Sequence, residues 1–159
     1  MREKKVQETE QILIDNYEKY YRLAYSYTRS QEDALDVVQE SAYKAIRDCS
    51  KVENSDYIST WIYRIVVNTS LDLLRKRQKN ENIVGNIEEE AICEDSYSDP
   101  DLKTALDQLD EAEKTVIVLR YFEDLKLDDI ARITDSNLNT VKARLYRGLK
   151  KLRSKLEGK

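Results

Sequence analysis

Apolar residues recur at steps of three and four along most of this chain, and that period matches the turn of an α-helix. The first stripe predicts one continuous helix with one buried face, formed by Leu13, Tyr17, Tyr20, Ala24 and Tyr27. Glycine (3) and proline (1) are too scarce for the tight hairpins of a β-protein or for a glycine-rich phosphate loop. We therefore predict an all-α fold built from amphipathic helices.

Two further stripes complete a helical domain that we place at residues 8–79. Ser30 is the expected N-cap of a helix whose first turn is acidic. The buried face of that helix is predicted to contain Ala34, Val37, Val38, Ser41, Ala42, Ala45 and Ile46. After a polar break, a long helix is predicted to end in the basic cluster 75–79 and to bury Ile58, Trp61, Ile62, Ile65, Val66, Thr69, Leu73 and Leu74.

Residues 80–100 have no helical period and are predicted to form a flexible linker. The segment 81–99 contains seven acidic residues and no basic residue, so like-charge repulsion and the lack of apolar area disfavour a packed core. Helical periodicity resumes at residue 101. We therefore expect two small helical domains, the second at residues 101–157, joined by an acidic linker.

Residues 127–150 have the proportions of a helix-turn-helix motif. A short helix from Leu127 to Ile133 is followed by a polar turn, in which Asp135 can adopt a left-handed conformation. A second helix follows, and its N-terminal half would enter a DNA major groove. Its inward face is predicted to contain Leu138, Val141, Leu145, Leu149, Leu152 and Leu156. Upstream, Asp110 and Glu113 have the spacing of a capping box.

The charge of this chain is segregated, so the net charge of −4 misrepresents its surfaces. Basic residues dominate from Lys142 to the C-terminus, where Glu157 is the single acid, and such local patches decide where phosphates bind. The residues expected to contact DNA from the last helix are Asn139, Thr140, Lys142, Ala143, Arg144, Tyr146, Arg147 and Lys150. The alternative is a solvated basic face on a C-terminal helix.

Several classes of function lack the residues they need. The chain has no histidine, and its two cysteines, Cys49 and Cys93, have no partner at metal-ligand spacing, so we expect reduced thiols. We predict no catalytic residue, no metal, no cofactor and no small-molecule substrate, although an enzyme built from carboxylates and lysines is a weaker alternative. No apolar run approaches the about 20 residues that span a bilayer, and no signal peptide is evident, so we expect a cytoplasmic protein.

Two pairs of segments resemble the sigma-70 family of transcription initiation factors. DALDVVQE (33–40) and WIYRIVVNTSLDLLR (61–75) resemble region 2. LDEAEKTVIVLRYF (109–122) and LDDIARITDSNLNTVKARLYR (127–147) resemble region 4. The order of these segments across a linker, with no region 3 between them, is typical of the extracytoplasmic-function (ECF) group. The resemblance implies a protein that binds RNA polymerase core and directs it to the −10 and −35 elements of promoter DNA.

The resemblance also implies roles for individual residues of the first domain. Asp36, Gln39 and Glu40 would dock on the clamp helices of the polymerase. The loop from Ser50 to Tyr57 would capture a flipped promoter base. The residues implied in contacts with the −10 element are Tyr57, Trp61, Arg64, Asn68, Arg75, Lys76 and Arg77. A lone tryptophan at helical spacing with isoleucines is equally typical of a core residue, so both interpretations of Trp61 remain.

The sequence departs from the family pattern at three positions of the second domain. Lys126 stands where serine is frequent, Asp135 where glycine is usual and Asp110 where proline is common. The resemblance further implies an inhibitory anti-sigma protein, often membrane-bound. The apolar segment from Val116 to Phe122 could dock such an inhibitor or the polymerase flap, but core packing explains it more simply.

Three alternatives stay open at this point. The linker either threads the nucleic-acid channel of the polymerase or serves as a plain tether. The whole chain could be a stand-alone helix-turn-helix regulator that binds a palindromic operator as a dimer. It could also be a helical adaptor that binds only proteins. The segments at 33–40 and 61–75 favour the sigma factor over both of the last two.

Overall fold

The computed structural model describes the backbone of residues 2–84 and 100–157 and the side chains of residues 2–79 and 104–156. Every regular element in these ranges is a helix, which confirms the all-α prediction. The chain divides into two compact units, residues 1–93 and 94–159. Residues 85–99 of the predicted linker, with Cys93, lie outside the described residues. No helix in the described ranges is long and apolar enough to cross a membrane.

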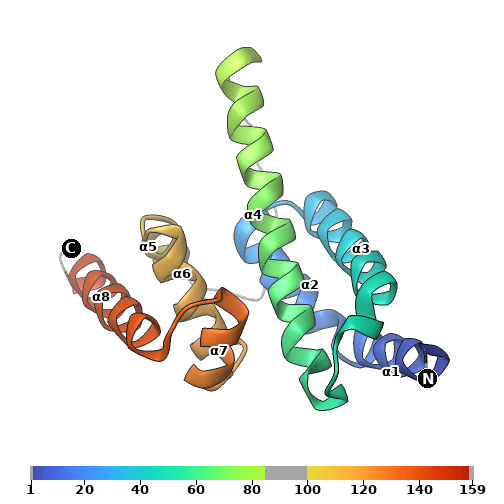
Figure 1. The fold of residues 1–159 in the computed structure, drawn as a ribbon. Coiled ribbons are helices and arrows are strands. Elements are labelled where there is room, and N and C mark those ends of the chain that lie inside the picture. The colour runs from blue at the N-terminus through green and yellow to red at the C-terminus, as the bar shows by residue number, and fades with distance from the viewer. Residues whose placement is uncertain (1, 85–99, 158–159) are drawn as a thin grey trace. The chain divides into compact units, whose positions relative to one another are not determined.

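The first unit contains α1 (Arg2–Asp15), α2 (Tyr17–Thr28), α3 (Gln31–Asp48) and α4 (Ile58–Val84) (Figure 1). Helices α2, α3 and α4 pack against one another, and α1 contacts α3, α4 and the loop between them. The centre of this packing is filled by large side chains that are almost fully buried, namely Tyr20, Leu23, Val37, Ile58, Ile62 and Val66. The rings of Tyr20 and Tyr63 meet edge to face, with their centroids 4.9 Å apart.

The N-terminal stripe forms two helices, so the prediction of one continuous helix was wrong. The break lies at Asn16, whose backbone leaves the helical conformation at φ −115° and whose Nδ2 donates to the Ile12 carbonyl oxygen at 2.9 Å. Asparagine side chains compete in this way with the helical backbone. The break turns Tyr17 outward, 44% exposed, whereas Tyr20 and Ala24 are buried as predicted.

Helix α3 begins where predicted, while α4 extends further than predicted. The Ser30 hydroxyl accepts a hydrogen bond from the Asp33 amide at 3.3 Å, which confirms the N-cap. Helix α4 does not end in the basic cluster but continues to Val84, and Figure 1 shows its last turns beyond the ends of α2 and α3. The reason is compositional, because the first glycine or proline after Ile58 is Gly85.

The second unit contains α5 (Pro100–Asp107), α6 (Glu111–Ile117), the π-helical turn η3 (Val118–Phe122), α7 (Leu127–Thr134) and α8 (Leu138–Glu157). Helix α8 packs against α5, α6 and α7. An apolar cluster joins α5, α6 and α8 through the buried residues Ala105, Leu106, Leu109, Ile117 and Leu152. Phe122 and Leu145 pack against this cluster.

The turn between α7 and α8 has the predicted conformation. Asp135 is left-handed at φ 55° and ψ 45°, and its amide donates to carbonyl oxygens of the last turn of α7. Asparagine and aspartate tolerate this conformation better than other non-glycine residues. Aspartate therefore serves at a left-handed position that ordinarily favours glycine.

The inward face of α8 was predicted only in part. Val141 and Leu152 are buried, but Leu149 is 37% and Leu156 is 41% exposed. Gly148 is buried in their place, and a Cβ atom there would lie 2.5 Å from Ile117 Cδ1. The missing side chain allows α8 to approach α6 closely, and this contact turns Leu149 toward solvent.

Replacing two leucines of α8 tests this packing. We expect Leu152→Ala to lower the free energy of unfolding of the second unit by about 2–4 kcal/mol, because it leaves a cavity in the apolar cluster. Leu149→Ala removes the same side chain from the same helix and should cost less than about 1 kcal/mol. Urea titration followed by NMR signals of residues 104–156 measures both, since Trp61 fluorescence reports on the other unit. Equal losses would contradict the observed orientation of α8.

Candidate nucleic-acid interface

The predicted DNA-binding residues of α8 share one side of the helix. They follow steps of three, one and three from Asn139 to Lys150, which keeps them on one face. The exposed members are Asn139, Lys142, Ala143, Tyr146, Arg147 and Lys150. Tyr146 is 70% exposed, an unusual position for a large aromatic side chain that leaves it accessible to a partner. Thr140 and Arg144 flank this side and are half-buried.

The turn before α8 is tied to the helix by two side-chain hydrogen bonds. Asn137 Oδ1 accepts from the Thr140 amide at 2.8 Å, so this amide at the start of α8 already has an acceptor. Arg144 Nη1 donates to Ser136 Oγ at 3.0 Å. Arg144 therefore holds the turn against the helix in addition to any contact with DNA.

A buried carboxylate links α6 to the basic side of α8. Glu113 is 2% exposed, and its two oxygens accept hydrogen bonds from Lys151 Nζ at 2.9 and 3.2 Å. Arg147 Nε donates to the same carboxylate at 3.4 Å. Lys151 Nζ also lies 3.8 Å from Asp110 Oδ2. These bonds restrain Arg147 and Lys151, although the side chains are 59% and 44% exposed.

The Glu113 carboxyl has a lowered pKa in this site. Burial would raise the pKa, but hydrogen bonds and charge from Lys151, with smaller contributions from the Asp110 amide and Arg147, outweigh it. The same hydrogen bond raises the pKa of Lys151. The bond from the Asp110 amide is one half of the predicted capping box, and the other half is missing because the Asp110 side chain caps no amide. The spacing of Asp110 and Glu113 predicted the capping position but not the two basic partners of Glu113.

The candidate −10 residues of the first unit lie along α4 and the loop before it. Trp61, Arg64, Asn68 and Arg75 follow steps of three, four and seven, so they share one side of α4. Asn68 and Arg75 are exposed, whereas Trp61 and Arg64 are half-buried. Trp61 is thus partly packed and partly accessible, which agrees with both interpretations of this residue. Tyr57 is half-buried at the end of the loop.

The basic cluster of α4 is partly neutralised within the unit. Arg77 pairs with Asp33, whose side chain is only 9% exposed. Arg75 Nη1 lies 3.5 Å from Asp72 Oδ1 on the exposed surface. The pair of Arg77 and Asp33 ties α4 to the first turn of α3, so Arg77 has a structural role beside the predicted contact with the DNA backbone.

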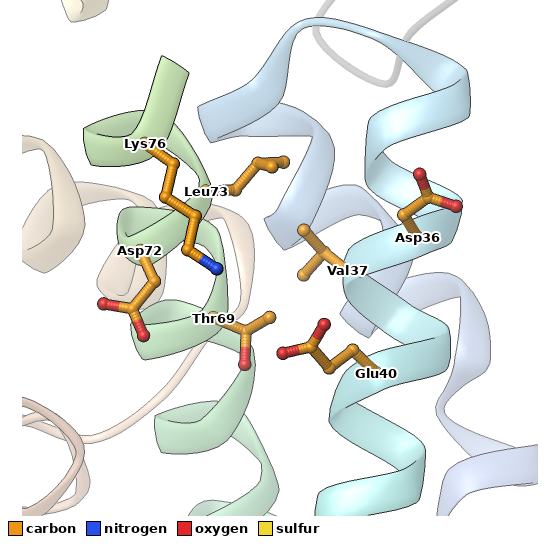
Figure 2. A pocket seen from close by; sticks show the side chains of 7 residues that line it. All are labelled: Asp36, Val37, Glu40, Thr69, Asp72, Leu73 and Lys76. Carbon is orange, nitrogen blue, oxygen red and sulfur yellow. The ribbon is translucent and has the colours of Figure 1, made fainter. Parts of the chain in front are cut away.

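The predicted polymerase-binding residues lie on α3, which exposes Asp36, Gln39 and Glu40. Two of them border a pocket of about 70 Å³ between α3 and α4, lined by Asp36, Val37, Glu40, Thr69, Asp72, Leu73 and Lys76. Figure 2 shows Val37 and Leu73 between the two helices, with Glu40 and Lys76 reaching toward the space from opposite sides. Lys44 Nζ bridges the helices nearby, 3.1 Å from both Glu40 Oε2 and Thr69 Oγ1.

The described residues contain no cluster of three or more histidine, cysteine or acidic side chains that could hold a metal ion. Cys49 is a buried free cysteine. The candidate binding surfaces are therefore an acidic one on α3 and, on the long helices α4 and α8, surfaces with exposed basic, polar and aromatic side chains.

Comparison with known proteins assigns this architecture to one family. The model of sigma-70 region 2 matches residues 13–80, and that of sigma-70 region 4 matches residues 101–152. RNA polymerase sigma factor SigV of Bacillus subtilis is 47% identical over 163 residues, which covers 96% of both chains. The ECF RNA polymerase sigma-E factor of Haemophilus influenzae is 32% identical, covering 92% of this chain and 86% of that protein.

Solved structures agree with this assignment. The sigma factor RpoE from Bartonella quintana, solved in complex with the anti-sigma factor NepR, has a TM-score of 0.80 and 25% identity over 93% of this chain and 96% of that chain. This chain belongs to the sigma-70 family. Within the family it is a sigma factor of the ECF group, as the resemblance of its sequence implied.

Removing the charge of Glu113 tests its role in holding α8. We expect Glu113→Gln to lower the free energy of unfolding of the second unit by about 1–2 kcal/mol at neutral pH, because the carboxylate charge is lost and one of the two acceptor oxygens becomes an NH2 donor. Because the pKa of Glu113 is lowered in the folded state, its carboxylate stabilises the fold at pH values above the ordinary glutamate pKa. This stabilisation is lost as the pH falls through the pKa of the folded state. The difference from wild type should therefore begin to shrink as pH falls below the ordinary glutamate pKa of about 4.3, and vanish only below the lower pKa of the folded state. Glu111→Gln, exposed in the same first turn, is the matched control, and an equal effect there would contradict the account.

Proposed function

We propose that this sigma factor binds RNA polymerase core through α3 and contacts the promoter through α4 and α8. The observation that supports this best is that Trp61, Arg64, Asn68 and Arg75 share one side of α4, and that the predicted residues of α8 gather on one side of that helix. Two separated DNA contacts on one polypeptide suit a protein that measures the spacing between two promoter elements.

We assign the −35 contact to the exposed side of α8. In a helix-turn-helix motif the second helix enters the major groove, where lysine and arginine reach guanine edges or phosphates. Lys142 and Lys150 are exposed on this side, and Tyr146 lies between them. Arg147 is restrained by Glu113 and therefore presents its guanidinium in a more defined position than the lysines do.

We assign the −10 contact to α4 and the preceding loop. Asn68 is exposed at the middle of the helix, where an amide can bond a base edge. Arg75 and Lys76 are exposed near the basic end of the helix and suit sequence-independent contacts with the DNA backbone. Tyr57 adjoins the loop that we expect to hold a flipped base, and an aromatic ring can stack on it.

The pocket between α3 and α4 suits a basic side chain of the polymerase. Its lining includes Val37 and Leu73, on which an aliphatic stem can pack. The acidic residues Asp36, Glu40 and Asp72 outnumber the basic residue Lys76 in this lining, so a further positive charge is favoured there. The pocket is small, so it accepts one side chain rather than a helix. Gln39 is exposed on the same helix outside the pocket and can add a directional hydrogen bond.

The net charge of −4 disfavours DNA binding by the free protein. Each unit offers a small DNA contact, and part of its basic charge is already neutralised by Asp33 or Glu113. Polymerase core would hold the two units at a defined spacing, so that the first contact raises the effective concentration of the second. Promoter selectivity would then appear only in the holoenzyme.

We further propose that an anti-sigma protein holds this factor inactive, as NepR binds its relative RpoE. The segment predicted to dock it is mostly internal, because Val116, Val118 and Leu119 are buried. Tyr121 is 55% exposed and is the accessible part of this segment. Membrane attachment of such an inhibitor stays a prediction from the resemblance.

The −35 assignment is tested by a lysine of α8 that lacks a structural contact with Glu113. We expect Lys142→Ala to weaken binding of the holoenzyme to promoter fragments about tenfold and to reduce the salt dependence by about one phosphate contact. Fluorescence anisotropy across a salt series measures both. Lys155→Ala, in the last turn of the same helix, is the matched control. Equal weakening by both variants would show a diffuse basic surface and not a docked helix.

The core-binding assignment is tested on the carboxylates of α3. We expect Asp36→Asn with Glu40→Gln to weaken the affinity for polymerase core at least tenfold, since both lose charge-assisted bonds to a basic partner. Glu18→Gln, an exposed carboxylate on α2, should leave the affinity unchanged. Titration of labelled protein with core enzyme gives the dissociation constants. Unchanged affinity in the double variant would remove α3 from the polymerase interface.

A further inference from the structure

The loop between α3 and α4 has a defined shape. It contains two short 3-10 turns, η1 (Cys49–Lys51) and η2 (Ser55–Tyr57), with the extended residue Val52 between them. Cys49 and Val52 are buried and anchor the loop to the unit. Glu53, Asn54 and Asp56 are exposed. The loop therefore presents exposed polar side chains to solvent, while Cys49 and Val52 hold it against the rest of the unit.

Helix α1 holds this loop through three successive side-chain contacts. Arg2 Nη1 donates to Ser50 Oγ at 3.3 Å, and the Lys5 ammonium donates to the Val52 carbonyl oxygen. The Ser55 hydroxyl donates to Glu8 Oε1 at 3.4 Å. Positions 2, 5 and 8 lie on one face of a helix, and they meet loop residues 50, 52 and 55 in the same order. Helix and loop thus run side by side over the whole loop.

The contacts differ in strength, and the central one matters most. The bond from Lys5 is charge-assisted and reaches a backbone atom, so it restrains the path of the chain next to the exposed Glu53 and Asn54. The side of α1 next to this face is packed, since Thr9 is fully buried. The residues that make the contacts precede the range 13–80 that matches sigma-70 region 2.

We propose that the N-terminal half of α1 braces the loop 50–57 and thereby sets how strictly this sigma factor selects a base of the −10 element. The proposal rests on the proposed function, in which this loop captures a flipped base. Extruding a base from the duplex is unfavourable, and a pocket that is already ordered loses less conformational entropy when it receives the base. Arg2, Lys5 and Glu8 are positioning residues that act through the loop.

The bracing is measured first by hydrogen exchange in the full chain. Lys5→Met keeps the aliphatic stem and removes the bond to Val52, and Ser55→Ala removes the bond to Glu8. In the double variant we expect the amides of Val52 and Tyr57, which form the turns of the loop, to exchange about tenfold faster. Lys4→Met, an exposed lysine of the same helix, is the control and should change nothing. Unchanged exchange in the double variant overturns the bracing.

Base selection is measured with the holoenzyme on a pool of promoter fragments randomised across the −10 element. Sequencing of the transcripts gives the preference for each base. We expect Lys5→Met with Ser55→Ala to reduce the preference at one position about threefold to tenfold, with the affinity for core unchanged. Lys5→Arg should retain the wild-type preference, because it keeps a charged donor.

Two outcomes separate this inference from the function on which it rests. If Asn54→Ala in the exposed part of the loop leaves every base preference unchanged, the loop does not select a base, and the proposed role of the loop fails together with the inference. If Asn54→Ala alters one preference while the double variant speeds exchange and alters none, the loop selects a base without help from α1. The second result overturns the inference and leaves the proposed function intact.

Discussion

In each unit a buried carboxylate in the first turn of a helix binds basic side chains of the long helix that we assign to DNA. Asp33 in α3 pairs with Arg77 of α4, and Glu113 in α6 binds Lys151 and Arg147 of α8. The first turn favours an acid because the helix dipole is positive there, so one carboxylate satisfies both the helix start and the long-range partners. Each pairing joins the first turn of one helix to the long helix that we assign to DNA.

The pairing also divides the basic residues into two groups. Those bound to a buried acid are held in place and keep part of their surface exposed, as Arg147 does. The other group is not bound to a buried acid. Lys142 of α8 is an example: it faces solvent and can move to contact a phosphate. A helix that combines both groups can be oriented by the first and attracted to DNA by the second. This arrangement also explains how an acidic protein can present a basic recognition surface.

Local signals of the sequence predicted most of the helices, the Ser30 cap and the polar turn. Ser30 and Asp135 have the predicted conformations because capping and left-handed turns depend on residues within one helical turn. The exposed side of α8 followed from periodicity alone. The same periodicity failed at Leu149, because the close approach at Gly148 depends on Ile117 of another helix.

The other differences between the predicted and the observed structure arise from tertiary contacts or from local side-chain hydrogen bonds. The break at Asn16 is accompanied by a hydrogen bond from its side chain to the Ile12 carbonyl oxygen, and the spacing of apolar residues cannot predict such a bond. The partners of Glu113 lie 34 and 38 residues away, so its spacing indicated only a helix cap. The contacts of Lys5 with the loop also join distant parts of the chain. Charge pattern and family resemblance predicted the binding surfaces, while the bonds that restrain their side chains became evident only from the fold.

Run-off transcription on promoter-containing genomic fragments, with purified polymerase core and with or without this protein, measures directly whether the chain converts core into a promoter-selective enzyme. We expect discrete transcripts that appear only when the protein is present, together with weak DNA binding by the protein alone. Tight, sequence-specific DNA binding without core, and no transcript that depends on the protein, would instead indicate a stand-alone operator-binding regulator.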